Sequence, residues 1–260
     1  MNRKVIYTCI VGNYDPIRQP LVVDNSFDYI CFTDNCESDK VGVWEIRPIP
    51  ETKETDKTRM SRYVKILPHK ALEAYDYSLY IDANIQIVNQ SFYDVINKKI
   101  EEEILFSIPI HPQRSCVYDE IIHVYFTDKV NLKDARRQLQ HLKKQNYPAK
   151  HGLYENNLLL RKHNDCIVKK ISKEWWDEYL DYSRRDQFSL VYVCWKNGFV
   201  PDLVFGKDMT IRNCPYIKYY LHPPKDLSIF KKNNSIRLVG RYFKHIYKKI
   251  NIMLFLSEPE

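Results

Sequence analysis

The segment DYSLYIDANIQIV, residues 76–88, ends an apolar run with two side chains that could bind a cation. Asp82 directly follows the apolar run, and Asn84 comes two positions later. Residues two apart in an extended chain lie on the same face, so a strand continuing through this point would present both oxygens together. Such ligands suit a hard divalent cation, Mg²⁺ or Mn²⁺, which also takes phosphate oxygens. The alternative interpretation is an Asp-x-Asn turn with a purely structural role.

A row of cations precedes this segment in the chain. Arg59, Arg62 and Lys65 recur every third residue within 56–75, where the apolar residues have helical spacing. We expect the three cations on one side of a helix, opposite most of its apolar positions, with Pro68 kinking or dividing it. A metal site beside such a row would suit a diphosphate. The alternative is an ordinary solvated helix face.

The surrounding pattern predicts an α/β fold. The pattern favours helices at 56–75, 167–182 and 186–197 and in the charged middle near 116–147. These segments alternate with apolar segments that favour strands, at 4–11, 27–34, 43–49, 77–81, 85–88, 104–110 and 155–161. This alternation indicates a mostly parallel, Rossmann-like sheet flanked by helices. Ligands of such sheets bind beyond the carboxyl ends of the strands, where we expect Asp82 and Asn84.

Composition indicates a near-neutral body with a basic tail. The chain has 260 residues and a net charge of +7, and its residues 231–249 hold seven cations and no acid. With Glu258 and Glu260 counted, the remainder carries only +2, so we expect a domain at 1–228 and a tail at 229–260. The sequence shows neither a signal peptide nor a membrane-spanning run. Its seven scattered cysteines fit reduced thiols in a cytoplasmic protein.

The tail could form an amphipathic helix from Ile236 to Leu256. Its apolar positions recur at three- and four-residue spacing: Leu238, Tyr242, Phe243, Ile246, Tyr247, Ile250, Met253 and Leu254. A helix with an apolar face bordered by basic residues can lie on the surface of an anionic membrane. The alternative is a helix that packs on the body by the same face.

Seven segments, in order, cover most of residues 5–195 and together resemble one family. They are VIYTCIVGNYD (5–15), YICFTDN (29–35), RMSRYVKILPH (59–69), YIDANIQI (80–87), HPQRSCVYDE (111–120), GLYENNLLLRKHN (152–164) and WWDEYLDYSRRDQFSLVYV (175–193). The chain is similar to a bacterial and plant glycosyltransferase-like domain formerly of unknown function, whose plant members are linked to pectin and mucilage. The resemblance implies a GT-A fold, a nucleoside-diphosphate-sugar donor and a carbohydrate acceptor.

The resemblance also implies roles for the motifs around the expected site. Asp82-Ala83-Asn84 sits where GT-A enzymes usually carry Asp-x-Asp, so the amide leaves strict metal dependence open. We expect Asn84→Asp to be tolerated, because it restores the commoner ligand. The loop Gly12-Asn13-Tyr14-Asp15 would face the nucleoside, and Asp34 would hold the base or ribose. Turn chemistry is the alternative for Asn13 and Asp34.

Asp186 and Gln187 are the candidates closest to the reaction. They open a predicted helix, where Ser183 could be the cap and Asp186 merely structural. An inverting transferase needs a carboxylate base for the acceptor hydroxyl. The Asp-Gln pair also resembles the pair near the sugar in glycogenin-like retaining enzymes, and the stereochemistry stays open.

Late and middle segments add weaker candidates. His222 and Lys225 in LHPPKD resemble the histidine and lysine that contact metal and phosphate in glycogenin-like enzymes. His111 and His151, like His222, are possible third metal ligands or phosphate contacts, with an ordinary structural role as the alternative. Arg114, Glu120 and Glu155 are further site candidates, the two glutamates by family position.

We therefore expect a glycosyltransferase that uses Mn²⁺ or Mg²⁺ and serves surface polysaccharide biosynthesis (O-antigen, capsule or lipopolysaccharide). Its acceptor would be a carbohydrate or lipid-linked glycan, met in the cytoplasm or at the inner face of the membrane. One alternative is nucleic-acid binding by the basic tail, although no RNA-binding signature accompanies it. Another is a phosphohydrolase with Asp82 as nucleophile, although Asp-Ala-Asn-Ile lacks the second acid. Donor sugar, base, acceptor and linkage are left open by the sequence.

Overall fold

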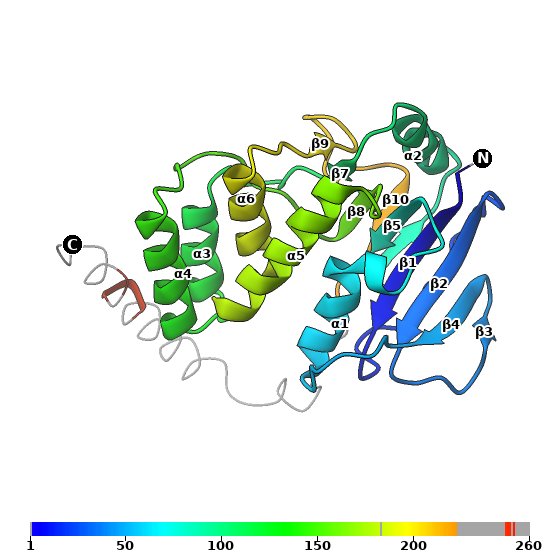
Figure 1. The fold of residues 1–260 in the computed structure, drawn as a ribbon, viewed down its shortest axis with the longest axis horizontal. Coiled ribbons are helices and arrows are strands. Elements are labelled where there is room, and N and C mark those ends of the chain that lie inside the picture. The colour runs from blue at the N-terminus through cyan, green and yellow to red at the C-terminus, as the bar shows by residue number, and fades with distance from the viewer. Residues whose placement is uncertain (1, 183, 223–247, 251, 253–260) are drawn as a thin grey trace, which may run out of the picture.

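A twisted eight-stranded sheet forms the centre of the molecule (Figure 1). The computed structural model describes residues 2–182, 184–222, 248–250 and 252. The strands lie in the order β3-β4-β2-β1-β5-β8-β7-β9, with the bounds β1 (Lys4–Ile10), β2 (Phe27–Thr33), β3 (Lys40–Val41), β4 (Trp44–Pro48), β5 (Tyr77–Ile81), β7 (Phe106–Ile108), β8 (Leu158–Arg161) and β9 (Asp202–Leu203). A second, two-stranded sheet pairs β6 (Ile85–Ile87) with β10 (Ile217–Tyr219).

The predicted parallel arrangement is confirmed for four neighbouring strands. β4, β2, β1 and β5 run parallel to one another, so their carboxyl ends meet at one edge. β3 and β8 are antiparallel to their neighbours, which makes the sheet mixed. β8 also begins at Leu158, three residues later than expected, because Asn156 and Asn157 form a turn before it.

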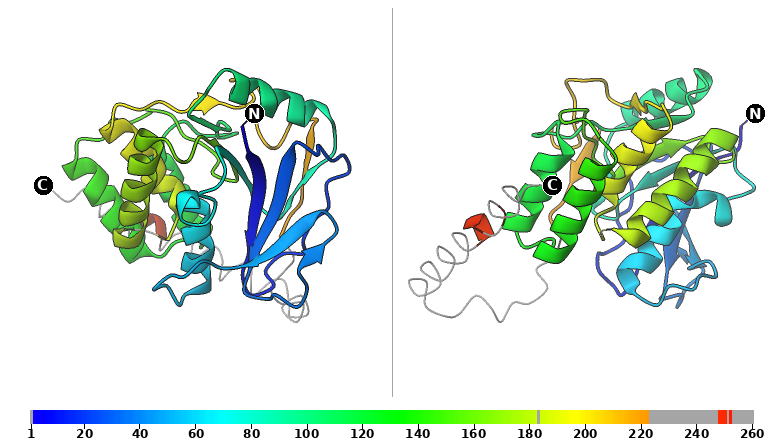
Figure 2. Two further views of the ribbon diagram at one scale, coloured as in Figure 1. Left: turned by 45° about the vertical axis from the view of Figure 1, so that its right-hand side comes forward. Right: turned by 60° about the vertical axis from the view of Figure 1, so that its left-hand side comes forward.

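Helices cover both faces of the sheet. The list of helices is α1 (Lys57–Ile66), the short 3₁₀ helix η1 (Pro68–Lys70), α2 (Ser91–Glu101), α3 (Val117–Phe126), α4 (Leu132–Lys144), α5 (Cys166–Asp181) and α6 (Asp186–Lys196). In Figure 2, α1 and α3 to α6 gather on one side, and α2 lies apart from them. As predicted, the helix expected over 56–75 is divided at Pro68, which opens η1.

Alternation along β1 builds two cores, one on each face of the sheet. Val5 and Tyr7 point into the core beneath α1, α5 and α6, while Ile6 and Ile10 point into the core beneath α2. Because β1 is covered on both faces, apolar side chains fill both sides of it and Thr8 is its one buried polar residue, close to the pattern of central parallel strands.

The few described residues of the tail pack on the body. Lys248 Nζ donates to the Tyr125 carbonyl at 2.7 Å and pairs with Asp128 at 2.6 Å, at the carboxyl end of α3. Ile252 is buried in the main core, whereas Ile250 is exposed. At Ile250, therefore, the predicted apolar face does not pack on the body. The rest of the predicted tail helix, with its membrane role, and Lys225 lie outside the described residues.

Two expectations about the whole chain can be compared with the described part. All seven cysteines are free thiols, as the sequence predicted. Within the described ranges, no helix combines the length and apolar character needed to cross a membrane.

Candidate active site

A polar cleft of about 660 Å³ opens at the carboxyl edge of β1 and β5. Side chains from α1, the loop after β1, the turn after β5, the start of α6 and the segments around 155 and 212–222 line it. Its cations are Lys57, Arg62, Lys65, Lys129, Arg185 and Arg212, and its carboxylates are Asp15, Asp82, Glu155 and Asp186. The structure thus brings Asp82, Asp186 and Gln187 to one cleft across about a hundred residues of sequence.

Asp82 stands at the end of β5, where the chain turns instead of continuing as a strand. The Ile85 amide donates to the Asp82 carbonyl at 2.9 Å, which closes a turn over residues 82–85. Asp82 Oδ1 accepts a hydrogen bond from the Tyr80 hydroxyl at 2.7 Å and lies 3.9 Å from Lys65 Nζ. The expectation that Asp82 and Asn84 share the face of a continuing strand is therefore wrong, because the strand stops at Ile81.

Asn84 is buried behind the cleft instead of lining it. Its amide nitrogen donates to the Tyr220 carbonyl at 2.8 Å, and its Oδ1 has no hydrogen-bond partner. An aspartate here would turn a carboxylate oxygen toward that carbonyl, so the expected tolerance of Asn84→Asp is not supported by this geometry.

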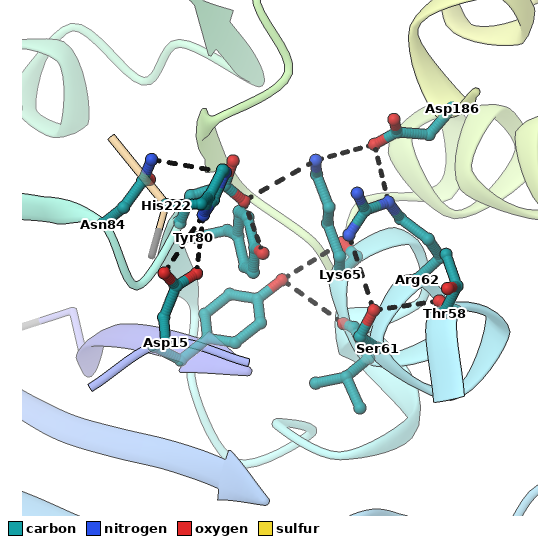
Figure 3. A network of polar contacts seen from close by, with 12 residues as sticks. Asp15, Thr58, Ser61, Arg62, Lys65, Tyr80, Asn84, Asp186 and His222 are labelled. Atoms are coloured by element: carbon teal, nitrogen blue, oxygen red, sulfur yellow. Dashed lines mark hydrogen bonds and ion pairs between the residues drawn. The ribbon is translucent and has the colours of Figure 1, made fainter. Parts of the chain in front are cut away.

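His222 joins this group from the segment after β10. Its Nδ1 lies 2.9 Å from Asp15 Oδ2, and its Nε2 lies 3.5 Å from the Asn84 amide nitrogen (Figure 3). The Tyr14 ring packs against the imidazole with 5.0 Å between ring centroids. From the sequence, Asp15 was expected only as part of the loop that faces the nucleoside. Its partner lies 207 residues away, so no local signal could pair them.

The side chains beside Asp82 are of types that can bind a divalent cation. They offer one carboxylate, an imidazole oriented by a carboxylate, and the buried Asn84 Oδ1, an oxygen without a hydrogen-bond partner. Over the described residues, no three His, Cys, Asp or Glu side chains converge closely enough to form a metal cluster on their own. Any metal held here would therefore depend on the amide oxygen and on ligand oxygens from a substrate.

Two of the three predicted α1 cations face the cleft, and the third does not. Lys65 is buried, with its Nζ 2.6 Å from Asp186 Oδ2, and Arg62 Nε lies 3.5 Å from the same oxygen (Figure 3). Arg59 instead pairs with Glu54 at 3.5 Å and is not on the cleft. The row is thus not an ordinary solvated face, and α1 turns only its last two cations toward the cleft.

A buried arginine holds the end of α1 in place. Arg161 on β8 donates to the Lys65 carbonyl at 2.6 Å and to the Ile66 carbonyl at 3.3 Å, and it contacts the Tyr7 hydroxyl at 2.6 Å. These contacts satisfy carbonyls that a helix end leaves without partners. They also fix the backbone from which the Lys65 side chain reaches the cleft.

The difference between Arg62 and Arg59 gives a direct test. Arg62→Gln should lower transfer by roughly tenfold or more through loss of one charged contact to substrate or to Asp186, whereas Arg59→Gln should stay near wild type. Steady-state rates with both substrates varied measure the two effects. Equal activity of the two variants would contradict a cleft role for Arg62.

Asp186 is held as a carboxylate by the α1 cations. Burial alone would raise its pKa, but Lys65 and then Arg62 lower the pKa by more, so it lies well below its usual range. At Lys65 the balance is reversed, because burial lowers the pKa by more than Asp186 and Asp82 raise it. Arg185 is the N-cap residue of α6 and makes no side-chain cap bond, and Ser183 lies outside the described residues. The Asp186 side chain instead forms an ion pair with Lys65.

Gln187 and Glu155 complete the floor beside Asp186. Gln187 donates its side-chain amide to the Tyr154 carbonyl at 2.7 Å. Glu155 lies 3.4 Å from Arg212, and its second oxygen has no hydrogen-bond partner. Burial raises the pKa of Glu155, Arg212 opposes this, and Asp82 adds to the increase. A carboxyl group with a raised pKa is suited to exchange a proton.

The loop after β1 only partly follows the expectation for donor-binding residues. Gly12 and Tyr14 line the cleft, whereas Asn13 and Asp34 do not. Asp34 Oδ1 accepts the Gly12 amide proton at 2.8 Å, and Lys57 lies 3.6 Å from its Oδ2. Gly12 has φ +68°, a left-handed conformation that favours glycine. The structure thus gives Asp34 a role in shaping the loop.

His111, Arg114 and Glu120 form a separate cluster beside a second cavity of about 420 Å³. Arg114 forms a close ion pair with the buried Glu120, and His111 Nδ1 accepts the Arg114 backbone proton at 2.9 Å. Burial lowers the pKa of His111 to about 4, so the ring is neutral. Neither histidine named as an alternative metal ligand lies on the main cleft: His111 is here, and His151 packs on Tyr147.

Comparison with known proteins decides the family. A family model described as TOD1/MUCI70, glycosyltransferase-like domain, matches residues 1–213. The chain belongs to this family. The predicted family, a glycosyltransferase-like domain, is confirmed, and the structure confirms the predicted α/β architecture.

Two solved structures resemble the TOD1/MUCI70 domain described here. One is the apo structure of the bifunctional glycosyltransferase WbbM, at 9% identity and TM-score 0.45, covering 74% of this chain and 37% of that chain. The other is the apo form of mouse xyloside xylosyltransferase 1, at 5% identity and TM-score 0.46, covering 78% and 84%. This chain therefore spans little more than a third of the WbbM structure. Comparison with curated protein sequences found no match.

Proposed function

We propose that the chain transfers a hexose or similar sugar from a nucleoside diphosphate to a glycan of a surface polysaccharide, such as O-antigen, capsule or lipopolysaccharide. One observation carries the proposal: Asp82, His222 and the α1 cations Arg62 and Lys65 meet on one cleft at the carboxyl edge of the parallel strands. Carboxylate, imidazole and cations in that position match the needs of a sugar diphosphate. The cytoplasm, where nucleotide sugars are available, is the proposed location.

Each side of the cleft has a proposed role toward the donor. Gly12 and Tyr14 contact the nucleoside, and Tyr14 offers a stacking ring. Asp82, Asn84 and His222 would hold Mn²⁺ or Mg²⁺, which when bound supplies positive charge to the leaving diphosphate. Arg62 and Lys65 flank Asp186 near the sugar. Lys225, a further phosphate contact expected from the sequence, lies outside the described residues.

The proposed reaction exchanges one bond at the anomeric carbon. The bond from this carbon to the diphosphate oxygen breaks, and the diphosphate leaves with the electron pair. A bond from the acceptor hydroxyl oxygen forms, and the hydroxyl proton passes to a cleft carboxylate or to the leaving diphosphate. Asp186 and Gln187 orient the sugar, since both line the cleft and are fixed by contacts to Lys65 and Tyr154.

Donor binding tests this proposal before any acceptor is known. Uridine, guanosine and thymidine diphosphate sugars with Mn²⁺ should be compared by thermal shift with single-stranded RNA and DNA. One donor at about a hundred times its Kd should stabilise the fold by about 2.7 kcal/mol, a Tm increase of several degrees. Stabilisation by nucleic acid alone, with none by any nucleotide sugar, would overturn the proposed function.

A further inference from the structure

Three consecutive residues of the cleft carry polar atoms that the protein itself does not pair. Glu155, Asn156 and Asn157 line the cleft, and each residue is more than nine-tenths buried. Over the described part of the chain, four of their buried side-chain atoms lack a hydrogen-bond partner, namely Glu155 Oε2, Asn156 Oδ1, Asn156 Nδ2 and Asn157 Oδ1. From the sequence, Glu155 was a candidate by family position, and the asparagines were only part of a matching segment. We call residues 155–157 the Glu-Asn-Asn segment.

Backbone hydrogen bonds hold this segment at both ends. The Glu155 amide donates to the Pro109 carbonyl at 2.9 Å, and the Asn157 carbonyl accepts from the Asp82 amide at 2.9 Å. β8 follows directly and pairs with β5. The unpaired side-chain atoms therefore do not belong to a loosely held loop. A fixed backbone presents them at one place in the cleft, which is the arrangement that a specific binding site needs.

The unpaired atoms are suited to a ligand that carries hydroxyl groups. A buried polar atom without a partner destabilises a folded protein, because it has lost its hydrogen bonds to water. Native proteins contain few such atoms, and a group of them in one cleft needs an explanation. The segment offers three oxygens that accept and one amide nitrogen that donates. A sugar ring fits this set, because each hydroxyl both donates and accepts, whereas the oxygens of a diphosphate only accept.

The position of the segment indicates which sugar it contacts. One end is bonded to the backbone of Asp82, which we place beside the metal and the diphosphate. The other end follows Tyr154, whose carbonyl accepts from the Gln187 side chain at 2.7 Å. In a nucleoside diphosphate sugar, the sugar is bonded directly to the diphosphate, so it lies between these two contacts. The segment therefore lines the place of the donor sugar.

We propose that the Glu-Asn-Asn segment binds the ring hydroxyls of the donor sugar, and that the donor is a sugar whose contacted hydroxyls are free, neither deoxy nor N-acylated. This inference rests on the proposed function, because it names the class of sugar that the same cleft takes. Glu155 Oε1 is paired with Arg212 at 3.4 Å, which leaves Oε2 for the sugar. Arg212 also stacks on the Tyr219 ring, 3.9 Å from its centroid. The carboxylate is thus oriented before the sugar binds, which lowers the entropy cost of binding.

Fluorinated donors test the proposed contacts one hydroxyl at a time. In a deoxyfluoro sugar, fluorine replaces one hydroxyl at similar size but cannot donate a hydrogen bond. UDP-glucose, GDP-mannose and dTDP-glucose are first compared with the matching nucleoside diphosphates by isothermal titration calorimetry with Mn²⁺. The 2-, 3- and 4-deoxyfluoro forms of the donor that binds best are then titrated. At least one of them should bind the wild-type chain about tenfold more weakly than the parent donor.

Asn156→Leu tests the protein side of the same contact. Both polar atoms of Asn156 are unpaired, so its replacement by an apolar side chain of similar shape should not lower the Tm of the free protein. The variant should bind the parent donor about tenfold more weakly and the nucleoside diphosphate unchanged. The fluorine penalty should also shrink, because both changes remove one contact. Asn156→Ala, measured in the same way, replaces this variant if it fails to fold.

Gln138→Met is the matched control. Both polar atoms of Gln138 are also buried and unpaired, but this residue lies on α4, outside the cleft. The same change from amide to apolar side chain should leave the affinities for donor and nucleotide at their wild-type values.

Each outcome supports or overturns the inference. Weaker donor binding with unchanged nucleotide binding in Asn156→Leu, and neither change in Gln138→Met, supports it. Equal weakening of donor and nucleotide overturns it, as does full donor affinity in Asn156→Leu or three fluorinated donors that all match the parent in wild type. If neither nucleoside diphosphates nor their sugars bind the full chain, the proposed function itself is wrong, whereas donor binding that the segment does not affect contradicts only the sugar contact.

Discussion

Replacing Asp82 with asparagine should lower the rate of sugar transfer on the order of 10²–10³-fold while changing Tm little. The side-chain oxygen of asparagine can still accept the hydrogen bond from Tyr80, and the backbone bond from residue 82 to the Asn157 carbonyl is unaffected. What disappears is the negative charge at the carboxyl end of β5. A site that binds a divalent cation together with a diphosphate depends on that charge.

The control variant should carry the same Asp→Asn substitution at a position outside the cleft. Asp94 lies exposed on α2, so Asp94→Asn removes the same charge far from the cleft and should retain wild-type rates. Mn²⁺ binding, followed by electron paramagnetic resonance, gives a readout separate from turnover and should weaken in Asp82→Asn. Unchanged turnover and unchanged Mn²⁺ binding in that variant would rule out Asp82 as the metal residue.

The order of elements and the edge that carries the cleft could be predicted from the sequence, because both follow from local periodicity. β1 and β5 read as buried strands, so the polar residues that follow them had to meet at one edge. Asp82 and Asp186 both line this cleft. Their catalytic roles stay predictions.

The partners of each charge could not be predicted, because they depend on contacts between distant segments. Helical spacing placed Arg59, Arg62 and Lys65 in one row, but it could not show that Lys65 is buried against Asp186, 121 residues later. Asp15 and His222, which also pair, are separated by even more residues in the sequence. Spacing reports which residues share a face of a helix, and only the packing of that helix decides what the face meets.

The ion pair between Lys65 and Asp186 should be needed both for the stability of the fold and for sugar transfer. Both side chains are nearly inaccessible, at 3% and 10% exposure, and their charged atoms are 2.6 Å apart. Lys65→Met leaves Asp186 buried with Arg62 still 3.5 Å away, and Asp186→Leu leaves Lys65 buried beside Asp82. Each single change should lower the free energy of unfolding by about 3–5 kcal/mol, because it strands a buried charge.

Acid should weaken this pair in wild type. The folded-state pKa of Asp186 is depressed, so its contribution to stability is complete above its unfolded pKa of about 3.9 and is lost as the pH falls toward the lower folded value. In Asp186→Leu this part of the acid dependence should be missing. Denaturant unfolding at pH 7 and at several values below pH 4 measures the difference.

The double variant Lys65→Met/Asp186→Leu separates structure from chemistry. Apolar side chains of similar volume should pack against each other, so most of the stability lost in the single variants should return. Transfer should not return, because neither the positive charge proposed to lie near the leaving group nor the carboxylate proposed to face the sugar is restored. Full recovery of both stability and turnover would show that the pair only supports the fold. Recovery of stability alone, at substrate concentrations well above KM, assigns the pair to the transfer step.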